Sequence, residues 1–153
     1  MIWLVRALVI GSLVWPLLLG AAVWQRVDPH GDRPWTTVVY LAGSRICHQL
    51  PDRSFHTAGV QWPVCARCSA LYLSAPVGGL AAVLPVLRRR RSERRALVWL
   101  AVASVPTAAT LAVQWLGLAE PSNIVRAVAA LPLGALLAYV IVGTAAGDAR
   151  SIG

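Results

Sequence analysis

The sequence predicts an all-α, polytopic membrane protein with four transmembrane helices and a long first outer loop that contains cysteine and histidine. Composition is the first observation: 58% of the 153 residues are hydrophobic, 13% are charged, and the mean hydropathy is +0.64. Soluble domains are nearer half apolar and a quarter charged. The second observation is four apolar stretches, each close to the ~20 residues that a bilayer-crossing helix needs. We therefore expect one domain, residues 1–153, with the lipid bilayer as its surroundings.

The four predicted spans cover approximately residues 7–24, 64–87, 96–118 and 124–147. Tryptophans lie near several of their ends, as expected for side chains at the membrane–water interface. They are Trp3, Trp24, Trp62, Trp99 and Trp115.

The first stretch has an alternative interpretation as a cleaved signal peptide. Gly20, Ala21 and Ala22 are small enough for a cleavage site. The apolar run is longer than the 7–15 residues typical of a signal, however, and Arg6 is its one positive flank. A retained transmembrane helix is therefore the primary prediction.

Arginine placement predicts the orientation. The net charge is +8, and the chain contains fourteen arginines, no lysine and six acidic residues. Six arginines form the run "RRRRSERR" between the second and third spans, and short arginine-rich loops stay in the cytoplasm. The 88–95 loop and both termini are thus predicted to be cytoplasmic, and the 25–63 loop to lie outside. Because this placement accounts for the basic charge, we expect no nucleic-acid partner.

The outer loop, residues 25–63, is too long to be a simple hairpin. We expect a turn-rich start, then a helix over Thr36–Leu50 on or partly in the membrane surface, then a turn at "LPDRS". The second span should open at Trp62-Pro63, since proline is tolerated in the first turn of a helix. Cys65 and Cys68 would then share one face of its first turns.

All three cysteines and two of the three histidines lie between Arg45 and Tyr72. Three thiols and one imidazole can complete a tetrahedral zinc site, and an odd number of cysteines favours metal over one disulfide. A thiol-rich site would also suit copper or an iron–sulfur cluster. The predicted ligands are Cys47, Cys65 and Cys68, with His56 as the easier fourth partner and His48 as the other candidate.

Two alternatives remain open for the same residues. The first is a membrane thiol–disulfide oxidoreductase in which Cys65 and Cys68 exchange electrons with a quinone. The positive end of a helix favours a thiolate at Cys65, and His48 would accept the proton. The second is a purely structural membrane protein whose cysteines are unliganded packing residues.

Three arginines are candidates for a different role, namely Arg53, Arg67 and Arg126. They could anchor the outer loop to the helices or bind an anion such as a lipid headgroup or phosphate. For Arg126, near the outer start of the fourth span, the default expectation is snorkelling to the interface.

Small residues recur every four positions in the second and fourth spans, which predicts close helix packing in lipid. They are Ser74, Gly78 and Ala82, then Ala130, Gly134 and Ala138. Whether the chain also pairs with a second copy or another membrane protein is left open.

The pattern "CHQ", "RSF", "VCARC" and a following tyrosine resembles the signature of a domain-of-unknown-function family of small prokaryotic membrane proteins. The resemblance implies a membrane location and a shared site. The matching positions are Cys47, His48, Gln49, Arg53, Ser54, Phe55, Cys65, Arg67, Cys68 and Tyr72, followed by Pro106, Gln114, Ser122 to Arg126, and Gly134.

One departure from that family pattern concerns the third span. The family pattern places an Asp-Gly pair four residues after the proline, where this chain has Thr110 and Leu111. An acid in lipid is costly and usually functional, so its absence argues against a proton relay or a cation path here.

Overall fold

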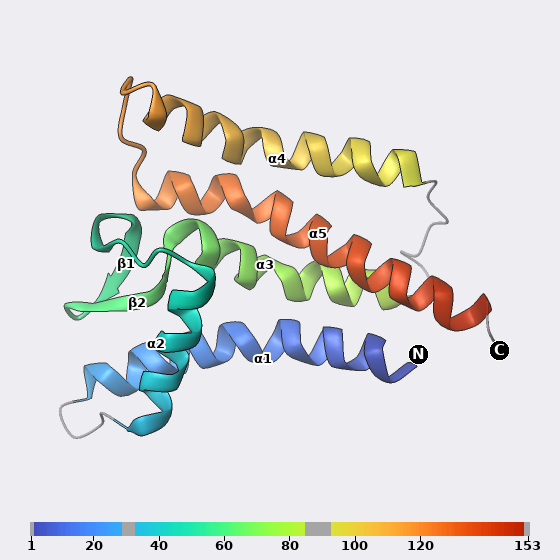
Figure 1. Cartoon of the computed structure of the whole chain (residues 1–153), viewed down its shortest axis with the longest axis horizontal. Helices are drawn as coiled ribbons and strands as arrows, with labels where there is room; N and C mark the ends of the chain where they lie inside the picture. Colours follow the sequence, from blue (N-terminus) through green and yellow to red (C-terminus); the bar gives the residue numbers. More distant parts are fainter. Residues whose placement is uncertain (1, 29–32, 85–92, 152–153) are drawn as a thin grey trace.

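Five α-helices and a two-stranded β-hairpin make up the described part of the chain (Figure 1). The computed structural model describes residues 2–28, 33–84 and 93–151. In chain order the elements are α1 (Ile2–Val27), α2 (Pro34–Ile46), the 3₁₀ helix η1 (Pro51–Arg53), β1 (Ser54–Thr57), β2 (Val60–Cys65), α3 (Ala66–Val83), α4 (Glu93–Trp115) and α5 (Asn123–Ser151).

The four long helices lie side by side in the order α1, α3, α5, α4 (Figure 1). Helix α3 packs most closely on α5, because glycines remove the side chains that would separate the two backbones. A β-carbon at Gly78 would collide with the carbonyl of Ala135, and one at Gly134 would collide with Ser74 and Leu71. The close packing predicted from the small-residue spacing is therefore confirmed.

Within the described residues, three helices are long and apolar enough to cross a membrane: α1, residues 94–115 of α4 and residues 123–146 of α5. Helix α3 does not join them, so the expectation of four spans is supported for three. Its 18 residues include a buried face of alanine, serine and glycine. That face contacts neighbouring helices, so it does not need the apolar side chains that lipid demands.

The hairpin was not predicted, and it shortens the second helix. Trp62 and Pro63 belong to β2, and α3 begins only at Ala66. The strands are antiparallel, with Ser54 opposite Cys65 and Thr57 opposite Val60. Their two-residue turn is Ala58-Gly59, both at positive φ, which matches the twist that tight hairpins require. A proline at the start of a helix and one in a short edge strand look alike in sequence.

Helix α2 replaces the predicted helix over Thr36–Leu50 and is shorter at its carboxyl end. It ends at Ile46, and Cys47 is extended with φ −147°. Gly43 in its last turn lies against the carbonyl of Pro63, with no room for a β-carbon. The predicted turn at "LPDRS" is confirmed as η1.

The two ends of the bundle differ in content. The hairpin, α2 and the α4–α5 connection lie at one end, which we call the hairpin end (Figure 1). Both chain termini lie at the other end, together with the carboxyl end of α3 and the amino end of α4. Arginines 88–91 of the predicted cytoplasmic loop fall outside the described residues.

Candidate metal centre

The three thiols meet at the hairpin end. Cys47 follows α2, Cys65 ends β2, and Cys68 lies in the first turn of α3. Their three Sγ atoms all lie within 4.8 Å of one another, and all three cysteines are free thiols. Sulfur ligands in a tetrahedral zinc site lie about 3.8 Å apart, because each Zn–S bond is about 2.3 Å. The observed group is close to that spacing without any disulfide.

Backbone geometry brings Cys47 to the other two cysteines. The backbone N–H of Cys65 donates a hydrogen bond to the Sγ of Cys47 at 3.1 Å. This hydrogen bond holds the Cys47 sulfur beside the backbone of Cys65. Cys65 precedes α3 in extended conformation, so Cys65 and Cys68 approach from a strand end and a helix start. The sequence pattern predicted that Cys65 and Cys68 share one helix face. The structure contradicts this, because Cys65 precedes α3.

Gln49 holds the two segments that carry Cys47 and Cys65 together. Its side-chain Nε2 donates to the carbonyls of Tyr40 at 2.8 Å and Pro63 at 2.6 Å. Its own carbonyl accepts a hydrogen bond from the Gln61 side chain at 2.7 Å. The backbone of Gln49 adopts a positive φ of 49°, which is costly for a residue other than glycine. Sequence reasoning assigned Gln49 no role, although it stands inside the "CHQ" motif.

The thiols are embedded in apolar surroundings. Cys47 and Cys65 are only 9% and 6% exposed. A dry, apolar shell strengthens electrostatic interactions at a site and restricts access by solvent. The buried residues that cluster with them are Leu19, Ala22, Val39 and Val64, with Trp15, Trp35, Tyr40 and Tyr72 packed against the cluster.

Among the three thiols, Cys65 has a lowered pKa. A hydrogen bond with the Cys68 side chain lowers the pKa of Cys65 to about 5, although burial acts in the opposite direction. The lowered pKa favours the thiolate form of Cys65. A lowered pKa stabilises the fold fully above the pKa of the unfolded thiol, about 9, and this contribution is lost as the pH falls to about 5.

Neither predicted histidine belongs to the group of thiols. The group of ligand atoms within 4.8 Å consists of the three sulfurs, so the rings of His48 and His56 lie farther away. His48 is exposed, and its Nδ1 accepts a hydrogen bond from the Leu50 N–H at 3.2 Å. His56 is exposed on β1, opposite Gln61. His48 is close enough to act electrostatically on the Cys65 thiol.

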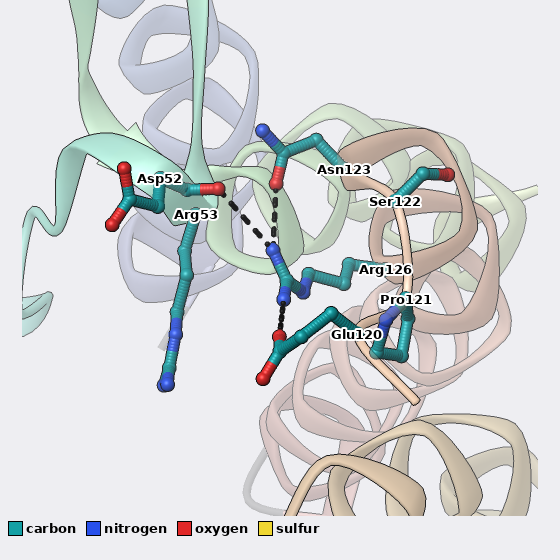
Figure 2. A pocket seen from close by; sticks show the side chains of 7 residues that line it. All are labelled: Asp52, Arg53, Glu120, Pro121, Ser122, Asn123 and Arg126. Carbon is teal, nitrogen blue, oxygen red and sulfur yellow. Dashed lines mark hydrogen bonds and ion pairs between the residues drawn. The ribbon is translucent and has the colours of Figure 1, made fainter. Parts of the chain in front are cut away.

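Arg126 is buried, so the expectation that it snorkels to the interface was wrong. It is 4% exposed, and its guanidinium donates to the Asp52 carbonyl at 3.3 Å and to Asn123 Oδ1 at 3.0 Å (Figure 2). A third bond, at 2.8 Å, joins it to Glu120. These partners surround the guanidinium, and a charge at this depth is favourable only when it is paired.

Asn123 completes the connection between α5 and the outer loop. Its side-chain nitrogen donates to the carbonyl of Ser54 at 2.9 Å. Arg67, by contrast, reaches α4, where it donates to the hydroxyl of Thr110 at 3.2 Å. The sequence pattern "SNIVR" contains Asn123 but does not indicate its role. Its partner Ser54 lies 69 residues away in the chain, so no local pattern could predict this contact.

Comparison with known proteins places the chain among membrane proteins. The sequence model of a family described as "Predicted membrane protein (DUF2085)" matches residues 47–140, which is more than half of the chain. An uncharacterized protein of Methanothermobacter thermautotrophicus is 36% identical over 96 residues, which cover 62% of this chain and 83% of that protein.

A second archaeal relative is an uncharacterized protein of Methanocaldococcus jannaschii. It is 32% identical over 104 residues, which cover 67% of this chain and 65% of that protein. The chain thus spans slightly less than two thirds of this relative. No solved structure matches the chain.

Proposed function

The chain belongs to the family of predicted membrane proteins designated DUF2085, and from that premise we propose that it binds one thiophilic metal ion, zinc first of all, through Cys47, Cys65 and Cys68. The observation that carries the proposal is the convergence of three free sulfurs from three different elements. Zinc suits such a group because it accepts tetrahedral thiolate ligands and takes no part in redox chemistry.

The surroundings of the thiols support metal binding over simple packing. Packing alone needs small apolar side chains, and alanine would serve. Here the Cys65 N–H donates to the Cys47 sulfur. The Gln49 side chain bonds the carbonyls of Tyr40 and Pro63, and so holds the segments that precede Cys47 and Cys65. Hydrogen bonds to ligand sulfurs and a rigid outer shell are features that orient and tune metal ligands.

His48 is the fourth ligand that we propose, in preference to His56. Its electrostatic effect on Cys65 indicates that it is the nearer of the two candidates to the thiols, and it follows Cys47 directly. Its Nδ1 is occupied by the Leu50 N–H, which leaves Nε2 for the metal. A side-chain rotation would be needed to bring it in. Copper or an iron–sulfur cluster remains the alternative occupant of a thiol-rich site.

In the membrane, we propose that α3 crosses together with α1, α4 and α5. Its 18 residues extend about 27 Å at 1.5 Å per residue, close to the hydrocarbon thickness. The hairpin end, with residues 25–63, would face outward, and the termini and the 88–95 loop would face the cytoplasm. The metal would then lie at the outer mouth of the bundle.

The thiol–disulfide oxidoreductase is retained as a second candidate because of one observation. Cys65 and Cys68 interact directly, and the pKa of Cys65 is lowered to about 5. Oxidation of the two thiols to a disulfide releases two electrons and two protons, which a membrane quinone would accept to become a quinol. In this alternative Cys65 is the attacking thiolate, His48 accepts its proton, and Cys47 is dispensable.

Metal analysis of the purified protein tests the proposal. Wild-type protein in detergent, prepared without chelators, should contain about one zinc ion per chain. Cys47→Ser and Cys68→Ser should each weaken binding by more than about tenfold, because each removes a ligand. The control is Ser44→Ala, an exposed change near the end of α2, which should retain the metal.

Two results would contradict metal binding. If wild-type protein is free of metal and Cys65 and Cys68 cycle with the quinone pool even in Cys47→Ser, the oxidoreductase holds. If it is free of metal and each cysteine can be replaced without loss of stability, the thiols are packing residues.

A further inference from the structure

A second polar feature lies at the hairpin end, separate from the thiols. A cavity of about 490 Å³ opens between η1 on one side and the α4–α5 connection with the start of α5 on the other. Its walls carry Arg53, Glu120, Ser122, Asn123 and Arg126 (Figure 2). Sites for small ligands usually have volumes of about 300–1,000 Å³, so this cavity could hold a small polar molecule.

Arg126 forms the buried wall of the cavity. Its two terminal nitrogens are bonded to Asp52, Asn123 and Glu120, whereas its buried Nε has no hydrogen-bond partner. Among the described residues, Glu120 is the one that forms an ion pair with Arg126, and its side chain is 73% exposed. Water competes for the exposed Glu120 carboxylate, which weakens its attraction for the buried guanidinium. The buried charge is therefore only weakly compensated.

Two further arginines add positive charge to the same region. Arg53 is half-buried on the opposite wall, and its side chain has no hydrogen bond or ion pair with any described residue. The charges of Arg126 and Arg53 oppose that of Arg67, whereas the Cys65 and Cys68 thiols favour it. The buried Nε of Arg67 has no hydrogen-bond partner. Arg67 therefore lies in the positive field of two neighbouring guanidinium groups, and such a field favours an anion beside them.

The acidic residues nearby do not neutralise this group. Asp52 contributes its carbonyl oxygen to Arg126, while its carboxylate is exposed and turned away from Arg126 (Figure 2). Glu120 is shared, since one of its oxygens accepts hydrogen bonds from both Arg126 and Gln114. The start of α5 adds the partial positive charge of a helix amino terminus at Ser122 and Asn123.

We propose that this cavity binds a phosphate-bearing anion through Arg53 and Arg126, with Arg67 adding long-range attraction. Planar guanidinium groups pair with phosphate through two parallel hydrogen bonds, and a helix amino terminus also attracts phosphate. Without a ligand, the Glu120 carboxylate pairs with Arg126. The bound phosphate would displace this carboxylate from the guanidinium. The phosphate can come from a free anion or from the headgroup of an anionic phospholipid.

Arg53→Gln is the decisive variant, because Arg53 makes no hydrogen bond in the described structure that its loss would break. The first arm measures binding of inorganic phosphate to the full chain in detergent by calorimetry. The second compares nanodiscs of phosphatidylcholine alone with nanodiscs containing phosphatidylglycerol, and measures the shift in unfolding temperature. The control is Arg45→Gln, which removes the same charge from an exposed position outside the cavity.

We expect binding in the wild type and in Arg45→Gln, and binding weaker by about tenfold or more in Arg53→Gln, since a hydrogen bond between charged groups is lost. Glu120→Gln should bind more tightly than wild type, because it removes the competing carboxylate. A response to phosphatidylglycerol alone would identify a lipid headgroup, and one to inorganic phosphate would identify a free anion. Equal binding by Arg53→Gln and wild type, or no binding of either probe by wild type, would overturn the proposal.

Discussion

At the scale of single residues, Gln49 shows how the candidate metal centre is held together. Its positive φ is unfavourable, and three hydrogen bonds to α2 and the hairpin compensate for it. The residue lies two positions after Cys47 and contacts Pro63, two positions before Cys65. A side chain that bridges these two segments controls how closely their thiols can approach.

We predict that Gln49→Glu destabilises the protein by about 1–3 kcal/mol, because it replaces the amide donor shared by the Tyr40 and Pro63 carbonyls with a carboxylate that can only accept. A thermal ramp with a thiol-reactive dye reports this directly, since the buried thiols react only when the site opens. The control is Gln25→Glu in α1, whose side chain makes no hydrogen bond with the described residues. Equal unfolding temperatures for the two variants would show that Gln49 does not fasten the site.

Arg126 is also held by contacts that are distant in sequence, and its buried position is the opposite of what the sequence predicted. An arginine near the end of a predicted span is ordinarily expected to reach out to the interface. Here the chain folds back over it, and η1 supplies the Asp52 carbonyl as a partner. The residue thereby connects α5 to the outer loop and forms one wall of the proposed anion site.

At the scale of elements, α3 and α5 form the central pair of the bundle. Lipid gives no hydrophobic driving force between helices, so close backbone approach is what favours their association. Gly78 and Gly134 are the two positions where a β-carbon would collide with the opposite helix. Gly79, next to Gly78, faces Ser12 of α1 at an ordinary contact distance of 3.4 Å.

We predict that Gly78→Ala destabilises the bundle by about 1–3 kcal/mol, the usual cost of overpacking. Gly79→Ala is the matched control, because its new methyl group has room and alanine has the higher helix propensity. It should be neutral or slightly stabilising. Unfolding in mixed detergent, followed by circular dichroism, measures both. A similar loss in the two variants would mean that helix α3 tolerates no methyl group anywhere on its packed face.

At the scale of the whole molecule, the arrangement separates two ends with different chemistry. The thiols, the arginine-lined cavity and the hairpin share one end, and both termini lie at the other (Figure 1). The proposed metal site and the proposed anion site therefore face the same compartment. Helix α3 carries Cys68 of the metal site directly after Arg67, whose charge interacts with those of Arg53 and Arg126.

We predict that this shared end faces outward. Single cysteines are introduced at Ala58, the tip of the hairpin, and at Ser92, in a background without the native cysteines. An impermeant thiol reagent applied to intact cells should label Ala58→Cys and should label Ser92→Cys only after permeabilisation. This pattern follows from retention of arginine-rich loops in the cytoplasm. The reverse pattern would invert the topology and place both proposed sites inside.

Much of the fold could be predicted from the sequence. Apolar runs of suitable length identified α1, α4 and α5, and the recurrence of small residues identified the closely packed faces of α3 and α5. The density of cysteine between Arg45 and Tyr72 identified the three thiols that meet in the structure. The role of the histidines stays a prediction, because neither lies within the group of sulfurs.

The sequence by itself determined what depends on composition and local periodicity: a helical membrane protein with its thiols in one segment. Only the tertiary structure decided that Trp62 and Pro63 form a strand, that Gln49 bridges the thiol-bearing segments and that Arg126 is buried. The physical reason is that these outcomes depend on partners far along the chain. A strand exists only when another strand pairs with it, and a buried charge or a positive φ is stable only when distant groups supply its hydrogen bonds.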